Sequence, residues 1–127
     1  MLVRVFATAL LACTVLAGAP AFAGEFKSLS LAAFQEAAAK GRPIVLHVRT
    51  PDGALCKAQH AVLEKLMKEP AFSNHVVFEI DFASQPAAVA MTGAKLPATL
   101  IFNRGQTEMG RLTSVTEESA IRALLTK

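Results

Sequence analysis

Hydrophobic and polar positions along residues 24–127 follow patterns that predict alternating helices and strands. Apolar positions three and four apart predict amphipathic helices, and short apolar runs bounded by turn residues predict buried strands. The predicted helices cover about 30–41, 54–69, 86–93 and 114–127, and the predicted strands cover 44–48, 76–82, 98–102 and 107–112. The resulting order is helix, strand, helix, strand, helix, strand, strand, helix. This order predicts an α/β fold in which a central mixed sheet is covered by helices on both faces.

Turn and capping residues mark the ends of these predicted elements. Ser30 has the side chain of a helix N-cap, and Gly93 is suited to close the third helix in the left-handed conformation. The segment 103–105, Asn-Arg-Gly, predicts a hairpin turn between the last two strands. The last helix has two candidate starts, Ser114 in a capping box and Thr116.

The first 23 residues form a physically different segment. They contain 18 hydrophobic residues and a single charge, Arg4, and they end in small residues before Gly24. A basic start, an apolar middle and small residues before the junction are typical of a secretory signal peptide, here cleaved after Ala23. An uncleaved membrane anchor and a lipid anchor at Cys13 are the alternatives. Cleavage predicts a periplasmic or secreted domain of residues 24–127, released from the membrane.

Composition limits the partners of this domain. The chain is 53% hydrophobic, its formal net charge is +3, and its basic residues are scattered without a cluster or interleaved aromatic residues. These features do not predict a nucleic-acid partner, and no motif for a cofactor is present. Of the two cysteines, Cys13 and Cys56, only Cys56 remains after cleavage. A single thiol in an exported protein is either a buried small hydrophobe or a group available for an intermolecular disulfide.

Several segments together resemble the thioredoxin family, over more than two thirds of the mature chain. The matching segments are the strand 43–46, the turn 51–57, the strand 76–81 and the loop and hairpin 96–105. The resemblance implies a thioredoxin-like fold with a cis peptide bond at Leu96–Pro97. It also implies a groove for an extended segment of another exported protein, lined by Asp52, Gly53, Leu96 and Pro97.

The redox motif of that family, Cys-x-x-Cys, is incomplete in this chain. The four positions read Gly53-Ala54-Leu55-Cys56, so glycine replaces the nucleophile and only the resolving cysteine is present. A dithiol–disulfide cycle needs two sulfurs, and this chain alone therefore supports at most single-thiol exchange with glutathione or with a thiol of an exported protein. His47 stands where the family has a buried acidic residue and is a candidate proton acceptor for Cys56, which a helix N-terminus favours as a thiolate.

Other interpretations of the same residues remain open. His47 can be a hydrogen-bonded core histidine and Cys56 a core filler, in which case the chain is a redox-inactive peptide-binding or assembly module that uses the cis-proline groove. Cys56 and His60 lie four residues apart on one predicted helix face and are weak candidates for binding a soft metal such as copper. Asp52 is the predicted N-cap of that helix. Met91 and Met109 are predicted to pack in the core.

Overall fold

The five strands form one mixed sheet in the order β1-β3-β2-β4-β5, within a computed structural model that describes residues 23–127. The strands are β1 (Glu25–Ser28), β2 (Pro43–Arg49), β3 (Val76–Asp81), β4 (Thr99–Arg104) and β5 (Thr107–Thr113). The helices are α1 (Leu31–Ala39), α2 (Ala54–Met67), α3 (Pro86–Thr92) and α4 (Glu118–Leu125), with a 3₁₀ turn, η1, at Pro70–Phe72. Residues 1–22, which hold nearly all of the predicted signal peptide, lie outside the described residues.

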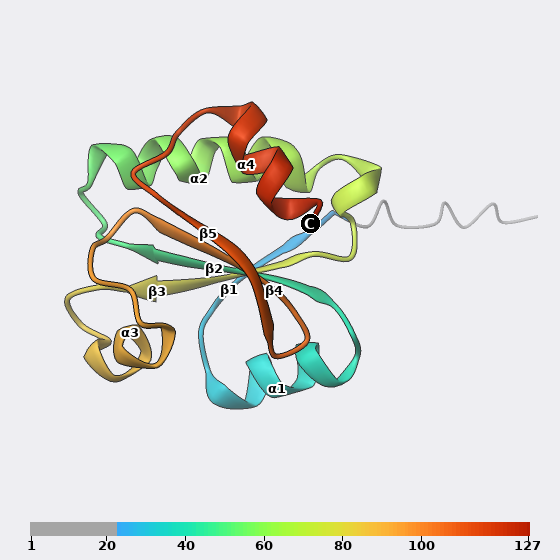
Figure 1. Ribbon diagram of the computed structural model, residues 1–127, viewed down its shortest axis with the longest axis horizontal. Helices are drawn as coiled ribbons and strands as arrows, with labels where there is room; N and C mark the ends of the chain where they lie inside the picture. Colours follow the sequence, from blue (N-terminus) through green and yellow to red (C-terminus); the bar gives the residue numbers. More distant parts are fainter. Residues whose placement is uncertain (1–22) are drawn as a thin grey trace, which may run out of the picture.

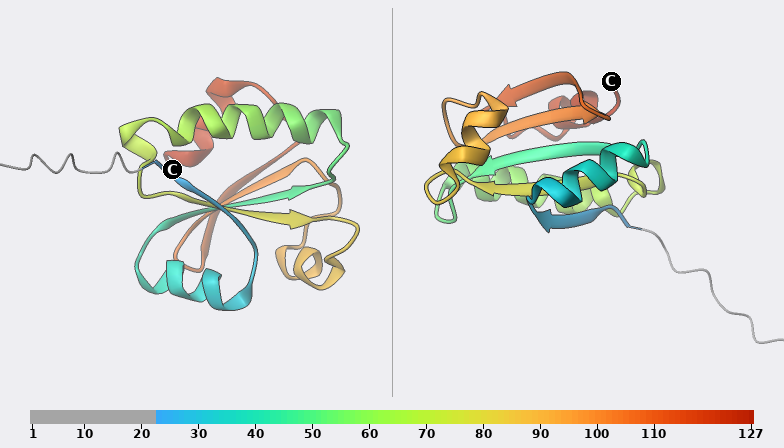
Figure 2. Two further views of the ribbon diagram at one scale, coloured as in Figure 1. Left: turned by 180° about the vertical axis from the view of Figure 1, so that it is seen from behind. Right: turned by 90° about the horizontal axis from the view of Figure 1, so that it is seen from below.

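Parallel and antiparallel pairings meet at the central strand. β2 runs parallel to β3 and antiparallel to β4, and β1 and β5 complete the two edges (Figure 2). Residues 44–48 of β2 are all buried, as the nearly continuous apolar run of this strand predicts for a strand covered on both faces. The predicted α/β class, with a mixed central sheet, is therefore confirmed.

Helices cover both faces of the sheet, with α2 and α4 on one side and α1 and α3 on the other (Figure 1). Leu63, Leu66 and Ile121 pack with Val45 and Phe102 in the core on the α2–α4 side. The α1–α3 side has its own core, built on Ile44, Phe78 and Ile101 among others. Along each strand, successive side chains alternate between these two cores, which is the geometry of a pleated sheet.

The structure differs from the sequence-based elements at several boundaries. β1 was not predicted, because its four residues pair with β3 at the sheet edge and offer only Phe26 as an apolar position. The hairpin turn lies at 105–106, where Gly105 has a φ of 60°, since Asn103 and Arg104 still pair with β5. The N-cap of α4 is Glu117, so both predicted starts, Ser114 and Thr116, are wrong. Ser114 instead has a φ of 60°, outside any helical start.

Two methionines that were expected in the core lie at the surface. The exposed fraction of Met91 is 78%, and that of Met109 is 38%. Met91 belongs to the short helix α3, and Met109 belongs to the edge strand β5. Both side chains face solvent and lie outside the two hydrophobic cores. No helix within residues 23–127 is both long and apolar enough to cross a bilayer.

Candidate functional site

The predicted site residues gather at one end of the sheet, where β2 ends and β4 begins. Val48 and Thr99 are partners in the antiparallel register, so the loop that follows β2 lies beside the loop that precedes β4. The first loop leads into α2, whose N-cap is Gly53 with extended backbone angles. Asp52, the predicted N-cap, is exposed and precedes the cap by one residue. The Gly53 turn and the Leu96–Pro97 loop thus lie at the same end of the sheet, and a groove between them stays a prediction.

Cys56 is the third residue of α2 and is almost completely buried. Its side chain is 2% exposed, and its Sγ lies 4.0 Å from the hydroxyl oxygen of Thr50. No disulfide involves this cysteine. The position in the first helical turn is the predicted one. The burial means that access to the sulfur depends on the residues that cover it.

Gly53 lies directly against the sulfur. A Cβ atom built on Gly53 would lie 3.1 Å from the Sγ of Cys56 and 3.4 Å from its Cβ. In a disulfide, a sulfur and the Cβ of the partner cysteine are about 3 Å apart, and the two Cβ atoms about 3.5–4.5 Å apart. The backbone therefore keeps the spacing of a disulfide-forming pair although the first sulfur is missing. The hydroxyl of Thr50 would lie 2.7 Å from the same Cβ position, so it occupies part of the vacated space.

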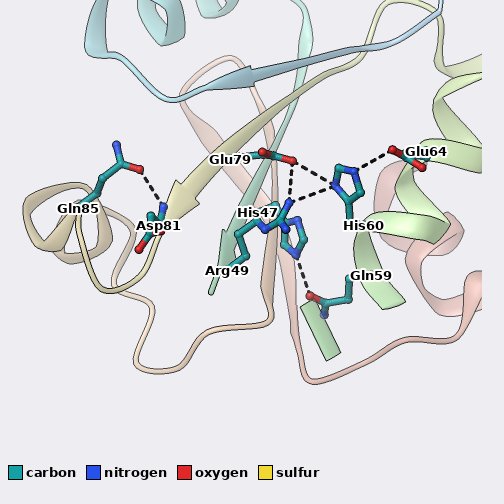
Figure 3. A network of polar contacts seen from close by, with 8 residues as sticks. All are labelled: His47, Arg49, Gln59, His60, Glu64, Glu79, Asp81 and Gln85. Atoms are coloured by element: carbon teal, nitrogen blue, oxygen red, sulfur yellow. Dashed lines mark hydrogen bonds and ion pairs between the residues drawn. The ribbon is translucent and has the colours of Figure 1, made fainter. Parts of the chain in front are cut away.

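His47 is fully buried in β2 and is held by Gln59 of α2 rather than by the thiol. Its Nε2 lies 3.0 Å from the Oε1 of Gln59 (Figure 3). The Nε2 of Gln59 donates to the carbonyls of Ala98, at 2.9 Å, and Val115, at 3.0 Å. Those two carbonyls use both amide protons, so Oε1 must act as the acceptor and His47 must carry its proton on Nε2.

This tautomer leaves the Nδ1 of His47 as a buried lone pair without a hydrogen-bond partner. Burial disfavours the imidazolium and lowers the pKa of His47 from 6.5 to about 4, against the opposing effect of the Gln59 hydrogen bond. The ring is therefore neutral at neutral pH. His47 and Cys56 are not joined by a hydrogen bond, so a role of His47 as proton acceptor for the thiol stays a prediction.

The Leu96–Pro97 bond, expected to be cis, is trans, and no peptide bond in residues 23–127 is cis. The chain reverses at Ala98 instead, whose φ of 57° lies in the left-handed region. The Ala98 carbonyl accepts from Ser114 N–H as well as from Gln59, and the hydroxyl of Thr99 donates to the Leu96 carbonyl at 2.8 Å. These bonds hold the reversed loop without a cis proline. The carbonyl of Leu96, a predicted groove residue, is therefore already bonded within its own loop.

A second polar network lies beside the first and contains His60. The Nε2 of His60 is 2.9 Å from Glu64 and its Nδ1 is 3.1 Å from Glu79, which also pairs with Arg49 at 3.1 Å (Figure 3). The predicted pairing of His60 with Cys56 is not formed, because both ring nitrogens face carboxylates. Within residues 23–127, no cluster of three or more His, Cys, Asp and Glu side chains is placed to hold a metal ion.

Sequence reasoning missed the structural roles of Gln59 and Thr50. Gln59 lies on the apolar side of α2, four residues before Leu63, and its burial shows that it faces the sheet. A polar amide at a core position of an amphipathic helix is a signal that a buried partner exists, but it does not reveal which one. Thr50 gives no such signal, because its contact with the Gly53 turn depends on the loop conformation.

Comparison with known proteins shows that several solved structures are similar to this chain. No family model matches the chain, and no curated protein matches it. A structure described as Trxlp, from Edwardsiella tarda EIB202, is 32% identical, with a TM-score of 0.77 over 80% of this chain and 99% of that one. The thioredoxin of Malassezia sympodialis (17% identity, TM-score 0.69, 81% and 91% of the two chains) and oxidised thioredoxin O2 of Arabidopsis thaliana (17%, 0.63, 82% and 93%) share the fold.

Replacing Gln59 by leucine tests the buried amide. The variant leaves the His47 N–H and the Val115 carbonyl without partners, and each such buried group costs about 1–3 kcal/mol. We expect the free energy of unfolding, measured in urea, to fall by about 2–6 kcal/mol. The matched control is Gln35→Leu on the exposed side of α1, which should change it by less than about 0.5 kcal/mol. Equal effects of the two variants would contradict the role of Gln59.

The buried histidines predict a loss of stability in mild acid. The pKa of His47 is lower in the folded protein, about 4, than its ordinary value of 6.5, so its contribution is complete above pH 6.5 and declines as the pH falls toward 4. This one group should remove about 2 kcal/mol between pH 7 and pH 5. Burial also lowers the pKa of His75, which adds in the same direction. Urea unfolding of His47→Leu against pH should show a shallower slope, whereas an unchanged slope would refute the assignment.

Proposed function

The chain belongs to the thioredoxin-like family, and we propose that it is an exported protein that handles thiols singly, through mixed disulfides at Cys56. The fold of this family is suited to redox chemistry on thiols. Cys56 is the one cysteine within residues 24–127 and supplies the thiol for this chemistry. The observation that carries the proposal is the 3.1 Å between the Cβ position of Gly53 and the Cys56 Sγ. That spacing defines a place for a second sulfur, supplied by another molecule.

The proposed exchange is balanced in atoms and electrons. The thiolate of Cys56 attacks one sulfur of a disulfide R–S–S–R′, forms Cys56–S–S–R and releases R′–S⁻. A thiol of the glutathione class, deprotonated, then attacks the R sulfur and restores the Cys56 thiolate. No net oxidation of the protein takes place. The incoming sulfur must approach through the space above Gly53, which the Thr50 hydroxyl partly fills, so rotation of Thr50 controls access.

A redox-inactive binding module is the second candidate, favoured by the burial of Cys56 and the exposure of its neighbours. Leu55 is 46% exposed and Leu96 is 57% exposed, and the two flank the turn at the same end of the sheet. Exposed leucines beside a shielded thiol suit contact with an apolar segment of a partner protein. In this alternative the contact uses side chains rather than a cis-proline groove.

Export is supported by the way the chain begins after the predicted cleavage site. The N–H of Gly24 donates to the Met67 carbonyl, at 2.8 Å, at the C-terminal end of α2. Cleavage after Ala23 would turn this nitrogen into a cationic amino group. A cation is favourable at the negative end of a helix dipole. Processing at this position therefore fits the folded domain without rearrangement.

We expect the chain, when it is expressed with its full N-terminus in a bacterium, to be recovered outside the cytoplasm with Gly24 as its first residue. Intact mass and N-terminal sequencing measure this directly. Substituting Ala23 by a bulky residue such as leucine should block cleavage, because signal cleavage needs small residues before the junction. Recovery of a soluble cytoplasmic chain that begins at Met1 would contradict export, and a product that begins at lipid-modified Cys13 would favour the lipid anchor.

Incubation with oxidised glutathione tests the single-thiol exchange. We expect the folded protein to gain the mass of one glutathionyl group, reversible by dithiothreitol. Thr50→Ala should accelerate the reaction several-fold, because it empties the space beside the sulfur. Gly53→Cys should instead form an internal disulfide, since its Cβ already lies at disulfide distance from the Cys56 sulfur.

Cys56→Ser is the control, which should gain no adduct. The same variants should be compared in denaturant, where the thiol is fully accessible. If the wild type and Thr50→Ala both react only when unfolded, single-thiol exchange is refuted and the binding module is the better description.

A further inference from the structure

A cavity lies on the face of the sheet opposite Cys56, between α1, α3 and the β4–β5 hairpin. Its volume is about 420 Å³, which is within the range of small-molecule binding sites. Figure 1 shows α1 and α3 well separated below the sheet, and these helices have nine and seven residues, against fourteen in α2. Two short helices leave part of this sheet face uncovered, and the cavity occupies that space.

The walls of the cavity are mainly apolar. Leu46 and Ile101 of the sheet form its floor, and Phe34 and Ala88 its sides. At the same cavity, the apolar side chains of Leu31 and Met91 are 60% and 78% exposed, so a ligand in the cavity could contact both. The flexible side chain of a methionine adapts readily to the shape of a ligand.

One buried polar group lines the cavity and has no partner. Asn103 is 8% exposed, and its Oδ1 is buried without a hydrogen bond. It lies next to an irregularity in the pairing of β4 with β5, between Phe102 and Asn103. Bulges of this kind redirect a side chain and occur beside functional sites. A buried amide oxygen without a partner lowers the stability of the fold, and a ligand in the cavity could supply the missing hydrogen bond.

The charges around the cavity indicate an uncharged ligand. Glu108 is the one charged residue of its lining, and both carboxylate oxygens of Glu108 are held by Arg111, at 2.5 and 3.0 Å. Arg111 also donates to the Thr92 carbonyl at 2.8 Å, which joins the hairpin to α3. A charged ligand would therefore lose its hydration without gaining a partner of opposite charge.

We propose that this cavity is a binding site for a small uncharged molecule with an apolar body and a hydroxyl-type head group that hydrogen-bonds to the Asn103 amide. A hydroxyl both donates and accepts, so it can pair with either atom of the amide. Because the amide oxygen has no partner to lose, the amide can rotate to face the ligand without breaking a bond at that atom. The site is independent of Cys56, which lies on the other side of the sheet.

Two probes of similar shape test the proposal: benzyl alcohol and ethylbenzene, which differ by a hydroxyl in place of a methyl group. Titration of each probe is followed by ¹H–¹⁵N NMR of the folded protein. We expect both to shift resonances around the cavity. Asn103→Leu should weaken benzyl alcohol roughly tenfold while leaving ethylbenzene unchanged or tighter, because one hydrogen bond to a buried group is lost. Ala88→Phe should fill the cavity and abolish both, and Leu55→Ala, on the opposite side, should affect neither.

The melting temperature of the protein gives a second measurement, which distinguishes a binding role of Asn103 from a purely structural one. Asn103→Leu should raise the melting temperature, because it removes a buried unsatisfied oxygen in favour of an apolar group of similar size. Failure of both probes to bind would overturn the proposal. Equal weakening of the two probes by Asn103→Leu, or a lower melting temperature of that variant, would also overturn it.

Discussion

The arrangement of the site depends on the hydrogen bonds of one buried amide, the side chain of Gln59. A single side chain on α2 bonds His47 of the central strand, Ala98 in the loop before β4 and Val115 in the loop before α4. These three segments are distant in sequence, and Gln59 bonds a polar group of each, sharing the Ala98 carbonyl with the N–H of Ser114. Because Gln59 satisfies all three, it sets how α2 lies on the sheet. The depth of Cys56, one turn earlier on the same helix, follows from that placement.

The same amide determines which tautomer His47 adopts in the site. Its two carbonyl partners fix its orientation, its orientation fixes the tautomer of His47, and burial keeps that ring neutral. A neutral histidine adds no charge beneath the thiol. The carboxylates of Glu64 and Glu79 are engaged by His60 and Arg49. The shielding of Cys56 is steric, because Thr50 and the Gly53 turn lie against its sulfur.

Sequence patterns were sufficient for the features that depend on local chemistry. The five buried residues of β2, the Ser30 cap of α1 and the left-handed Gly93 all follow from residue types at defined spacings. The strand β1 was missed because its stability comes from pairing with β3, which no local pattern encodes. The trans bond at Pro97 was missed because Ala98 reverses the chain in a left-handed conformation that tertiary hydrogen bonds hold. Gln59 was visible as a polar residue on an apolar helix side, but its three partners required the fold.

Both faces of the sheet hold a buried polar atom without a hydrogen-bond partner, but the surroundings of that atom differ. On the α2–α4 face a long helix covers the sheet, and Gln59 bonds His47 and two carbonyls, while the Nδ1 of His47 stays unpaired in the core. On the α1–α3 face two short helices leave a cavity, and the oxygen of Asn103 stays unpaired at its edge. Since an unpaired buried group lowers stability, retaining it is expected where the group has a use. The Gly53 turn beside Cys56 and the unpaired amide of Asn103 therefore lie on opposite faces of the sheet, the first packed against Thr50 and the second at the edge of a cavity.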